Sequence, residues 1–236
     1  MNVPQDNTVY HWAPGRGYEH LKEWLPSDFD LIQSDEYSCY SKLNNELKLP
    51  AHARCRAHLS RKFFDALKQG EPARRNSWIV HQIGLLCQIE KRLRAGKAGL
   101  DLREAIRQSE SRPVITRLFR LWRRMLTNGS TKPRSLTGKA LAYALGIETG
   151  LKVYLDHGEV EIDNNLIENA IRPITLGRKN GLFIGDKEAG WRSAVIYTIV
   201  RSCQRHGINP YAYLKDVLER LPNLNRGQIR QLTPKA

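Results

Sequence analysis

The chain of 236 residues is poor in the features that mark membrane and secreted proteins. No apolar run approaches the roughly 18 residues that a membrane-spanning helix needs, and the first residues lack the basic and apolar regions of a secretory signal. Only four cysteines occur, and their wide scatter argues against a disulfide framework. These absences predict a cytoplasmic protein that has no membrane partner.

Acidic residues are scarce relative to basic ones. The chain has 38 lysines and arginines against 24 aspartates and glutamates, a formal net charge of +14 and a pI near 9.8. This excess of positive charge favours a polyanionic partner such as DNA. Six arginines crowd one helical region, where they either follow a DNA backbone or form an ordinary solvated face. They are Arg103, Arg107, Arg117, Arg120, Arg123 and Arg124.

Hydrophobic periodicity predicts an α/β chain with four parts. In residues 1–71, short β-like runs at 8–12 and 29–33 alternate with helical runs at 18–25 and 57–69. Residues 72–158 have apolar side chains at helical spacing throughout and glycine or proline breaks that divide them into about three helices. Residues 159–222 return to an α/β pattern and end in helices at 189–206 and 211–220, and residues 223–236 form a loosely ordered tail.

The run from Val160 to Pro173 is the most informative stretch of the chain. Its first three residues predict a short strand, Asp163 is placed to cap the helix that follows, and Pro173 is expected to stop that helix. Glu168 and Arg172 are four residues apart and therefore share a helix face. A carboxylate that can hold a cation would thus lie near a guanidinium that can hold phosphate. The alternative is a capped surface helix with an ordinary Glu–Arg pair.

The next segment, residues 175–185, predicts a basic hairpin. Asn180-Gly181 is a turn signal between two short apolar runs. The hairpin would carry Arg178 and Lys179 next to the Glu168 helix.

Taken together, these residues resemble the C-terminal part of transposases of the insertion-sequence-66 family. The matching motif here is Asp163-Asn164-Asn165, Glu168, Arg172-Pro173 and Gly177-Arg178-Lys179-Asn180. Residues 31–40 resemble the family's strand that carries the second catalytic aspartate, followed by Tyr-x-x-Tyr, and residues 55–65 resemble the helix after it. Counterparts of the family's segments extend from about residue 8 to about residue 221.

The resemblance implies a ribonuclease-H-like catalytic domain with an all-helical insertion between the second aspartate and the glutamate. Two aspartates and one glutamate of such enzymes hold divalent metal, Mg²⁺ or Mn²⁺. By resemblance Asp35 is the second acid and Glu168 the third. The first acid belongs to an opening strand that precedes the segments found here, and Asp6, in a turn-like stretch, is a poor substitute. We therefore expect an N-terminally truncated transposase whose domain lacks its first strands.

The function that the resemblance implies is DNA cleavage and strand transfer by divalent-metal phosphoryl transfer, on transposon ends and target DNA. Two metal ions normally serve such a reaction. Because the first of the three acids that would hold them is missing, the chain alone should be inactive or nearly so. Its expected phosphate contacts are Arg172, Arg178, Lys179 and Arg192, and its expected supporting residues are Asp163, Asn164, Asn165 and His58. A homo-oligomer, or a complex with full-length transposase, is a further implication. The alternative is a non-catalytic remnant that binds DNA or the transposase and interferes with transposition.

Other candidate residues are weaker. Cys55-x-x-His58 has the spacing of half a zinc site but no second close pair accompanies it, and His58 could equally be a buried, hydrogen-bonded histidine. Trp78 and Trp122 have apolar neighbours and are expected in the core. Trp191, which adjoins Arg192, is the better candidate for stacking on a base.

Overall fold

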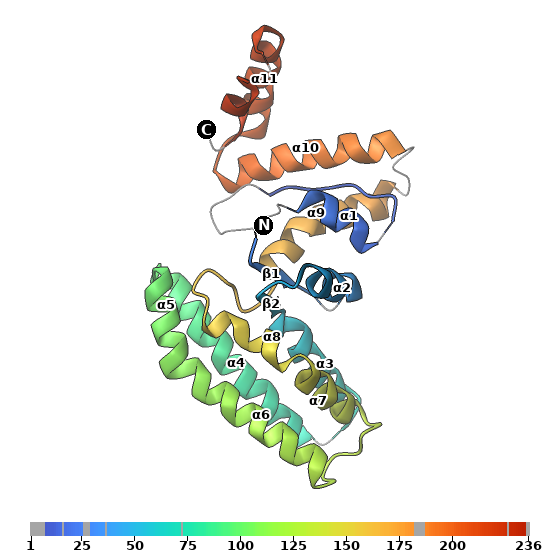
Figure 1. Ribbon diagram of the computed structural model, residues 1–236, viewed down its shortest axis with the longest axis vertical. Helices are drawn as coiled ribbons and strands as arrows, with labels where there is room; N and C mark the ends of the chain where they lie inside the picture. The colour runs from blue at the N-terminus through green and yellow to red at the C-terminus, as the bar shows by residue number, and fades with distance from the viewer. Residues whose placement is uncertain are drawn as a thin grey trace. The chain divides into compact units, whose positions relative to one another are not determined.

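The computed structural model describes residues 8–15, 17–25, 29–35, 37–71, 73–181, 187–225 and 227–234. The chain forms two compact units (Figure 1). The central unit is Leu25–Asn165, and the terminal unit combines Met1–Trp24 with Leu166–Ala236. No helix among the described residues combines the length and apolarity that a membrane crossing requires. All four cysteines belong to the described residues and are free thiols.

The central unit contains the only sheet within the described ranges, a parallel pair of short strands. Strand β1 (Leu31–Ser34) pairs with β2 (Ala51–Arg54), and helix α2 (Ser38–Leu47) provides the crossover that parallel strands require. Gly150, in helix α8 (Glu148–Lys152), approaches this sheet so closely that a Cβ there would lie 2.7 Å from the His52 carbonyl oxygen. The fold is therefore mostly helical, with a small parallel sheet that is compatible with the expected α/β class.

Helices make up the rest of the central unit. They are α3 (Arg56–Lys68), α4 (Ala73–Ala95), α5 (Leu100–Ile106), α6 (Arg112–Thr127), α7 (Leu136–Gly146) and α8 (Glu148–Lys152), followed by the 3₁₀ turn η2 (Val153–Leu155). A π-helical turn, η1 (Arg107–Ser111), joins α5 to α6. Residues 72–158, which were expected to be helical, contain helices α4 to α8.

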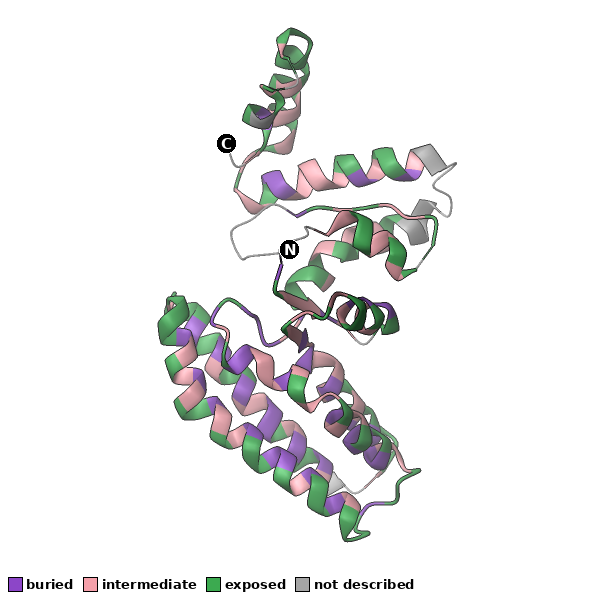
Figure 2. Cartoon of the chain, in the orientation of Figure 1, coloured by how far each residue is buried: buried purple, intermediate pink, exposed green. Residues whose placement is uncertain are grey.

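The hydrophobic core of this unit lies between these helices (Figure 2). Helix α6 turns one apolar stripe inward, and its Trp122 is buried against Phe63 of α3, with ring centroids 5.6 Å apart. Trp78 was expected in the core, but it is 38% exposed, so that prediction is wrong. The core positions of α4 are Ile79, Ile83 and Leu86, and the residue before Ile79 is rotated by about 100° away from that stripe.

A buried ionic network joins α4, α5 and η1 of the central unit to Glu161. Arg107 and Glu90 are fully buried and joined by two hydrogen bonds, Nε to Oε1 at 2.8 Å and Nη2 to Oε2 at 2.7 Å. Arg107 Nη1 also donates to the carbonyl oxygens of Tyr154 and His157, both at 2.8 Å. Arg103 is buried as well and pairs with Glu90 and with Glu161. Two of the six arginines expected on a DNA-facing or solvated face therefore belong to the interior.

The terminal unit consists of α1 (Tyr18–Trp24), α9 (Asn165–Gly181), α10 (Lys187–Arg205) and α11 (Pro210–Arg220), with short 3₁₀ turns at Leu221–Asn223 and Ile229–Leu232. Residues 8–12, expected as a strand, are not one. The N–H of Tyr10 donates to Thr198 Oγ1 at 2.9 Å, and Ser202 Oγ donates to the Thr8 carbonyl at 3.3 Å. Side chains of α10 thus supply the partners that a neighbouring strand would have supplied.

The tail after residue 222 is more ordered than expected. Leu232 is buried, and the Tyr213 hydroxyl of α11 donates to the Leu232 carbonyl oxygen. This contact folds the described part of the tail back onto the helix.

Helix α9 continues through Pro173, so the predicted stop is wrong. Proline has no N–H, and at this position it removes the hydrogen bond that the carbonyl of Asn169 would accept within the helix. Arg201 of α10 replaces that bond, because its Nη2 donates to Asn169 O at 3.2 Å. A contact from another helix thus offsets part of the cost of the proline.

The turn predicted at Asn180-Gly181 for a hairpin is also not formed. Asn180 and Gly181 are the last two residues of α9, not the turn between two strands. The periodic pattern that starts at Asn165 outcompetes the local turn signal. Residues 182–186, which would form the second strand, lie outside the described residues, as do the side chains of Arg178 and Lys179.

Candidate functional site

Asp35 directly follows the carboxyl end of β1. Its carboxylate is half-buried, and Oδ1 accepts one hydrogen bond, from the N–H of Tyr37 at 3.0 Å. Its carbonyl oxygen accepts from Arg54 Nη1, at the matching end of β2, at 2.9 Å. The backbone of Asp35 is thus held by the neighbouring strand while its carboxylate retains lone pairs for a further ligand.

Two titratable groups near the carboxyl end of β1 are uncharged at neutral pH. His52 Nε2 lies 2.7 Å from Ser34 Oγ in a hydrogen bond, and burial, with the adjacent Arg54 charge, lowers the pKa of His52 to about 4. Burial raises the pKa of the Tyr40 hydroxyl, and the charge of Asp35 raises it further. At neutral pH, Asp35 is therefore near an uncharged phenol, and the neighbouring Ser34 binds an uncharged imidazole.

Gln33, one of the β1 residues, links the strand of Asp35 to the segment before Glu168. Its Nε2 donates to the carbonyl oxygen of Glu161 at 2.6 Å. The N–H of Arg56 donates to Ile162 O at 3.2 Å, and the N–H of Asn164 donates to Cys55 Sγ at 3.3 Å. Residues 160–162 are buried beside the sheet but do not form the predicted strand. The segment is held by these three hydrogen bonds, from a side-chain amide, from one backbone N–H and to a thiol. They replace the regular backbone hydrogen bonds that a paired strand would form.

The Glu161 side chain fastens the same segment from its other side. Its carboxylate accepts from Arg103 Nη2 at 2.8 Å and from Arg94 Nη1 at 3.4 Å. Glu161 is buried together with Val160 and Ile162, so the segment does not alternate between buried and exposed positions as a half-buried strand does. The backbone of the segment is thus tied to β1 and its side chain to α4 and α5.

Asp163, which was expected to cap the helix, binds the first N–H group of α9. Its Oδ1 accepts from the N–H of Asn165, the first residue of α9, at 3.0 Å. Asn164 is buried, whereas Asn165 is exposed. Burial raises the pKa of Cys55, and the nearby Asp163 charge contributes to this rise, so Cys55 binds Asn164 as a thiol. These contacts give Asp163 and Asn164 structural tasks at the start of the helix that carries Glu168.

The other predicted residues fall into both units. Glu168 is half-buried in the first turn of α9, and Arg172, one turn later, is exposed. Trp191 is 63% exposed, and the adjacent Arg192 is exposed as well, near the start of α10. Asp35 and the half-buried His58 belong to the central unit, whereas Glu168, Arg172 and Arg192 belong to the terminal unit.

Sequence reasoning missed Gln33, Arg94, Arg103 and Glu161 as residues that fasten the site. A weak signal existed for Gln33, because it interrupts the short apolar run of β1 with a polar side chain. Glu161 interrupts Val160 and Ile162 in the same way. Polar residues within a short buried run require partners, and here those partners are distant in sequence.

Comparison with known proteins matches almost the whole chain to one family. Residues 2–192 match the family described as "Transposase IS66 family", and residues 198–234 match the "IS66 C-terminal element". No solved structure matches the chain significantly.

Similar proteins are found in Sinorhizobium fredii (strain NBRC 101917 / NGR234), and all are described as uncharacterized. Protein y4qI is 33% identical over 222 residues, which cover 90% of this chain and 40% of the relative. Protein y4jD is 34% identical over 221 residues, covering 90% and 42%. Protein y4hP is 28% identical over 246 residues, covering 96% and 43%. The chain thus spans about two fifths of the length of these relatives. Since the family match extends over residues 2–192, the chain belongs to the IS66 transposase family.

Proposed function

We propose that this chain forms part of the catalytic domain of an IS66 transposase, which cleaves and rejoins DNA by divalent-metal phosphoryl transfer. The observation that carries the proposal is the position of Asp35 at the carboxyl end of a parallel strand, inside the segment matched to the family. Ligands of parallel sheets bind outside the carboxyl ends of the strands. The proposed domain is ribonuclease-H-like, with β1 and β2 as two of its strands and residues 72–158 as its helical insertion.

The proposed metal ligands are Asp35 and Glu168, and the donor set fits Mg²⁺ or Mn²⁺. Carboxylate oxygens are the donors that these hard ions prefer. Asp35 accepts one backbone hydrogen bond on one oxygen, and a carboxylate has about four lone-pair sites. A divalent ion bound there would supply activation of the attacking oxygen and stabilisation of the leaving oxygen.

The proposed DNA contacts are Arg172, Arg178, Lys179 and Arg192. Arginine and lysine bind phosphate oxygens, which position a DNA strand without reading its sequence. The exposed indole of Trp191 adds a surface on which an unpaired base can stack. We propose the same supporting role for Asp163, Asn164 and Asn165, at the start of α9, and for His58, in α3.

We further propose that this chain by itself has little activity, because it offers two of the three acids that the family resemblance assigns. Its partners are then transposon ends, target DNA and further transposase chains, in the cytoplasm. The rival description, a remnant that binds DNA or transposase without catalysis, predicts no metal site at Asp35 and Glu168.

Mn²⁺ binding tests the proposal without requiring activity. Binding measured by electron paramagnetic resonance should weaken about ten-fold or more in Asp35→Asn and in Glu168→Gln, since removing a residue that only orients a metal ligand already costs about 10–100-fold. Asp101→Asn and Glu219→Gln, which neutralise exposed acids elsewhere, are the matched controls. A nicking assay on supercoiled DNA then asks whether any Mn²⁺-dependent cleavage is lost in the same two variants. Equal Mn²⁺ affinity in all five proteins would refute the proposed site and favour the remnant.

A further inference from the structure

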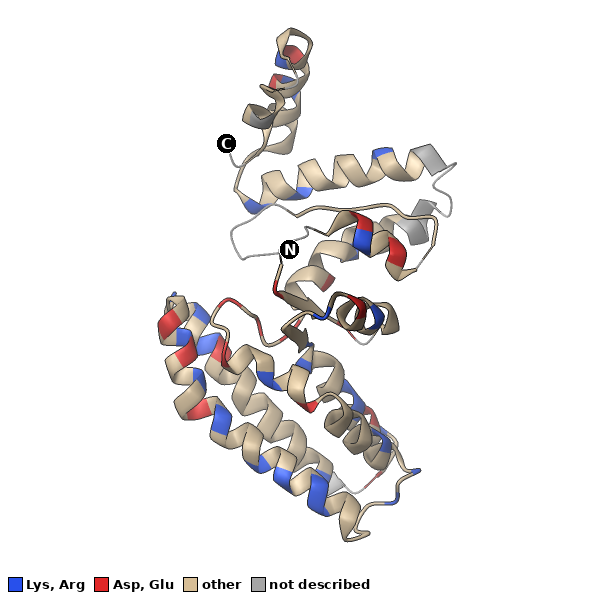
Figure 3. Ribbon diagram, in the orientation of Figure 1, with Lys and Arg blue, Asp and Glu red and all other residues tan. Residues whose placement is uncertain are grey.

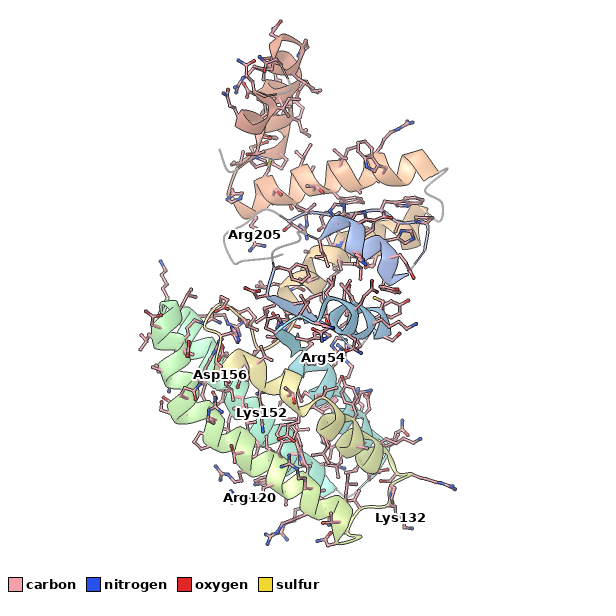
Figure 4. All side chains as sticks on the ribbon, viewed as in Figure 1. Arg54, Arg120, Lys132, Lys152, Asp156 and Arg205 are labelled. Carbon is pink, nitrogen blue, oxygen red and sulfur yellow. The ribbon has the colours of Figure 1, made fainter. Side chains whose placement is uncertain are left out.

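Helix α6 presents arginines to solvent on the face opposite its core stripe. Arg117, Arg120 and Arg124 are exposed, and their spacing of three and four residues places them on one face. Figure 4 shows the Arg120 side chain extending away from the helix. The buried residues of α6 fix this orientation, because Trp122 and Phe119 are packed in the core. We call these three residues the α6 arginine row.

The sequence around the row contains no acidic residue. No aspartate or glutamate occurs from Arg112 to Ile147. The same stretch contains eight basic residues: Arg112, Arg117, Arg120, Arg123, Arg124, Lys132, Arg134 and Lys139. Figure 3 shows the corresponding band of basic positions on α6 and the loop after it. The net positive charge per residue is therefore much higher in this stretch than in the chain as a whole.

The arginines of this region differ in whether they have an acidic partner. Arg103 and Arg107 are buried in the ionic network, Arg112 pairs with Asp156, and Arg123 pairs with Glu148. The three members of the row have no ion pair with any described residue. They are thus the part of the predicted six-arginine cluster that is available to a partner.

An ordinary solvated face does not account for the row. Exposed helices usually mix charges of both signs, as α11 does with Lys215–Glu219 and Arg220–Asp216. Like charges three or four residues apart destabilise a helix. The helix dipole favours a cation in the last turn and so explains Arg124, but not Arg117 or Arg120. A bound polyanion would remove this repulsion.

We propose that the α6 arginine row binds the phosphate backbone of duplex DNA, as a second contact surface beyond Arg172, Arg178, Lys179 and Arg192. The row spans seven residues, about 10 Å at 1.5 Å per residue. That length matches about three phosphate charges along one strand, which are spaced by about 3.4 Å. The choice of DNA as the polyanion rests on the proposed function.

Other partners fit this face less well. A single strand needs aromatic platforms for its bases, and the only aromatic residues of α6, Phe119 and Trp122, are buried. A membrane-surface helix needs a free apolar face, whereas the apolar face of α6 forms the core. Neither a base stack nor an acyl layer would find a partner on the row.

Fluorescence anisotropy with a labelled duplex of arbitrary sequence tests the proposal. The triple variant Arg117→Gln, Arg120→Gln, Arg124→Gln should bind at least about ten-fold more weakly near 100 mM salt. The slope of log K against log salt should fall by about 0.9 for each lost phosphate contact, about 2.7 in all. The matched control Lys91→Gln, Arg92→Gln, Lys97→Gln removes the same charge from exposed positions around the end of α4 and should bind within about two-fold of the wild type.

A third variant guards against a folding defect. Arg117→Lys, Arg120→Lys, Arg124→Lys keeps the charge and should retain most of the affinity and the salt slope, with an unchanged circular dichroism spectrum. The proposal is overturned by absent duplex binding in the wild type, by an unaltered slope in the glutamine variant, or by equal losses in the α4 control. A greater loss of binding to single-stranded DNA or to anionic vesicles than to duplex would also overturn it.

Failure of this inference is distinguishable from failure of the proposed function. The glutamine variant of the row should bind Mn²⁺ as the wild type does, because no row residue is a proposed ligand. If Asp35→Asn and Glu168→Gln lose Mn²⁺ binding while the row variant keeps its duplex affinity, the row alone is overturned.

Discussion

Replacing Arg107 by methionine should destabilise the central unit more than any exposed charge substitution. The change removes both hydrogen bonds to the buried Glu90 carboxylate and leaves Arg103, at 3.4 Å, as its remaining ionic partner. It also removes the donor of the Tyr154 and His157 carbonyl oxygens. Breaking a buried pair by removing one partner costs about 3–5 kcal/mol. At about 2–4 °C per kcal/mol, the midpoint of thermal unfolding should fall by about 10 °C.

Urea and thermal unfolding, followed by circular dichroism, measure this effect. The control is Arg92→Met, which breaks the pair of Arg92 with Glu110, two exposed side chains, and should cost about 0–1 kcal/mol. The double variant Glu90→Leu, Arg107→Met removes the unpaired charge and should recover part of the loss. Full recovery is not expected, because the Tyr154 and His157 carbonyls still lack their donor. A cost below about 1 kcal/mol for Arg107→Met, or one equal to that of Arg92→Met, would refute this account.

Three further predictions concern pH, the proline in α9 and a helix cap. His52 has a pKa of about 4 in the fold against 6.5 in the unfolded chain, so stability should fall as pH drops from about 6.5 to 4; an NMR titration of its ring that gives a pKa near 6.5 would contradict this. Pro173→Ala should stabilise α9 by up to about 3 kcal/mol and abolish the cost of Arg201→Met, because the new N–H serves Asn169 O; additive effects in the double-mutant cycle would sink this idea. Glu71→Gln should cost about 1 kcal/mol at neutral pH, because the Glu71 carboxylate accepts the first N–H groups of α7. Burial raises the pKa of Glu71, but hydrogen bonds from Thr137 and its neighbours outweigh this effect and lower the pKa. The stability difference between the wild type and Glu71→Gln should therefore be present above about pH 4.5 and vanish as pH falls below it. A difference that is unchanged at pH 3 would contradict the cap.

Much of the helical architecture could be predicted from the sequence. The apolar stripes of α4 and α6 and the helices near residues 18–24, 56–68, 187–205 and 210–220 have periods that neighbouring residues alone determine. The short strand before Asp35 and the hydrogen bond that Asp163 accepts at the start of α9 follow from local signals of the same kind. The family motif added the candidate roles of Asp35 and Glu168, which Mn²⁺ binding is designed to test.

The failed expectations have two causes. Pro173, Asn180-Gly181 and residues 160–162 carry local signals for a helix stop, a turn and a strand. The first and the third were overridden by partners distant in sequence, Arg201 for the proline and Gln33 for the segment beside the sheet. The turn signal was overridden by the longer helical period around it. The six arginines show the same limit of local patterns, because burial of Arg103 and Arg107 depends on Glu90 and Glu161.

The sequence by itself determined the excess of positive charge, the periods of the long helices and the motif that identifies the family, since these depend on composition and on residues a few positions apart. Only the tertiary structure decided which arginines are buried and which face solvent, and how the segment before Glu168 is held. The physical reason is that buried polar groups must find partners. Gln33 finds its partner 128 positions away, at the carbonyl of Glu161, and no local pattern encodes that choice.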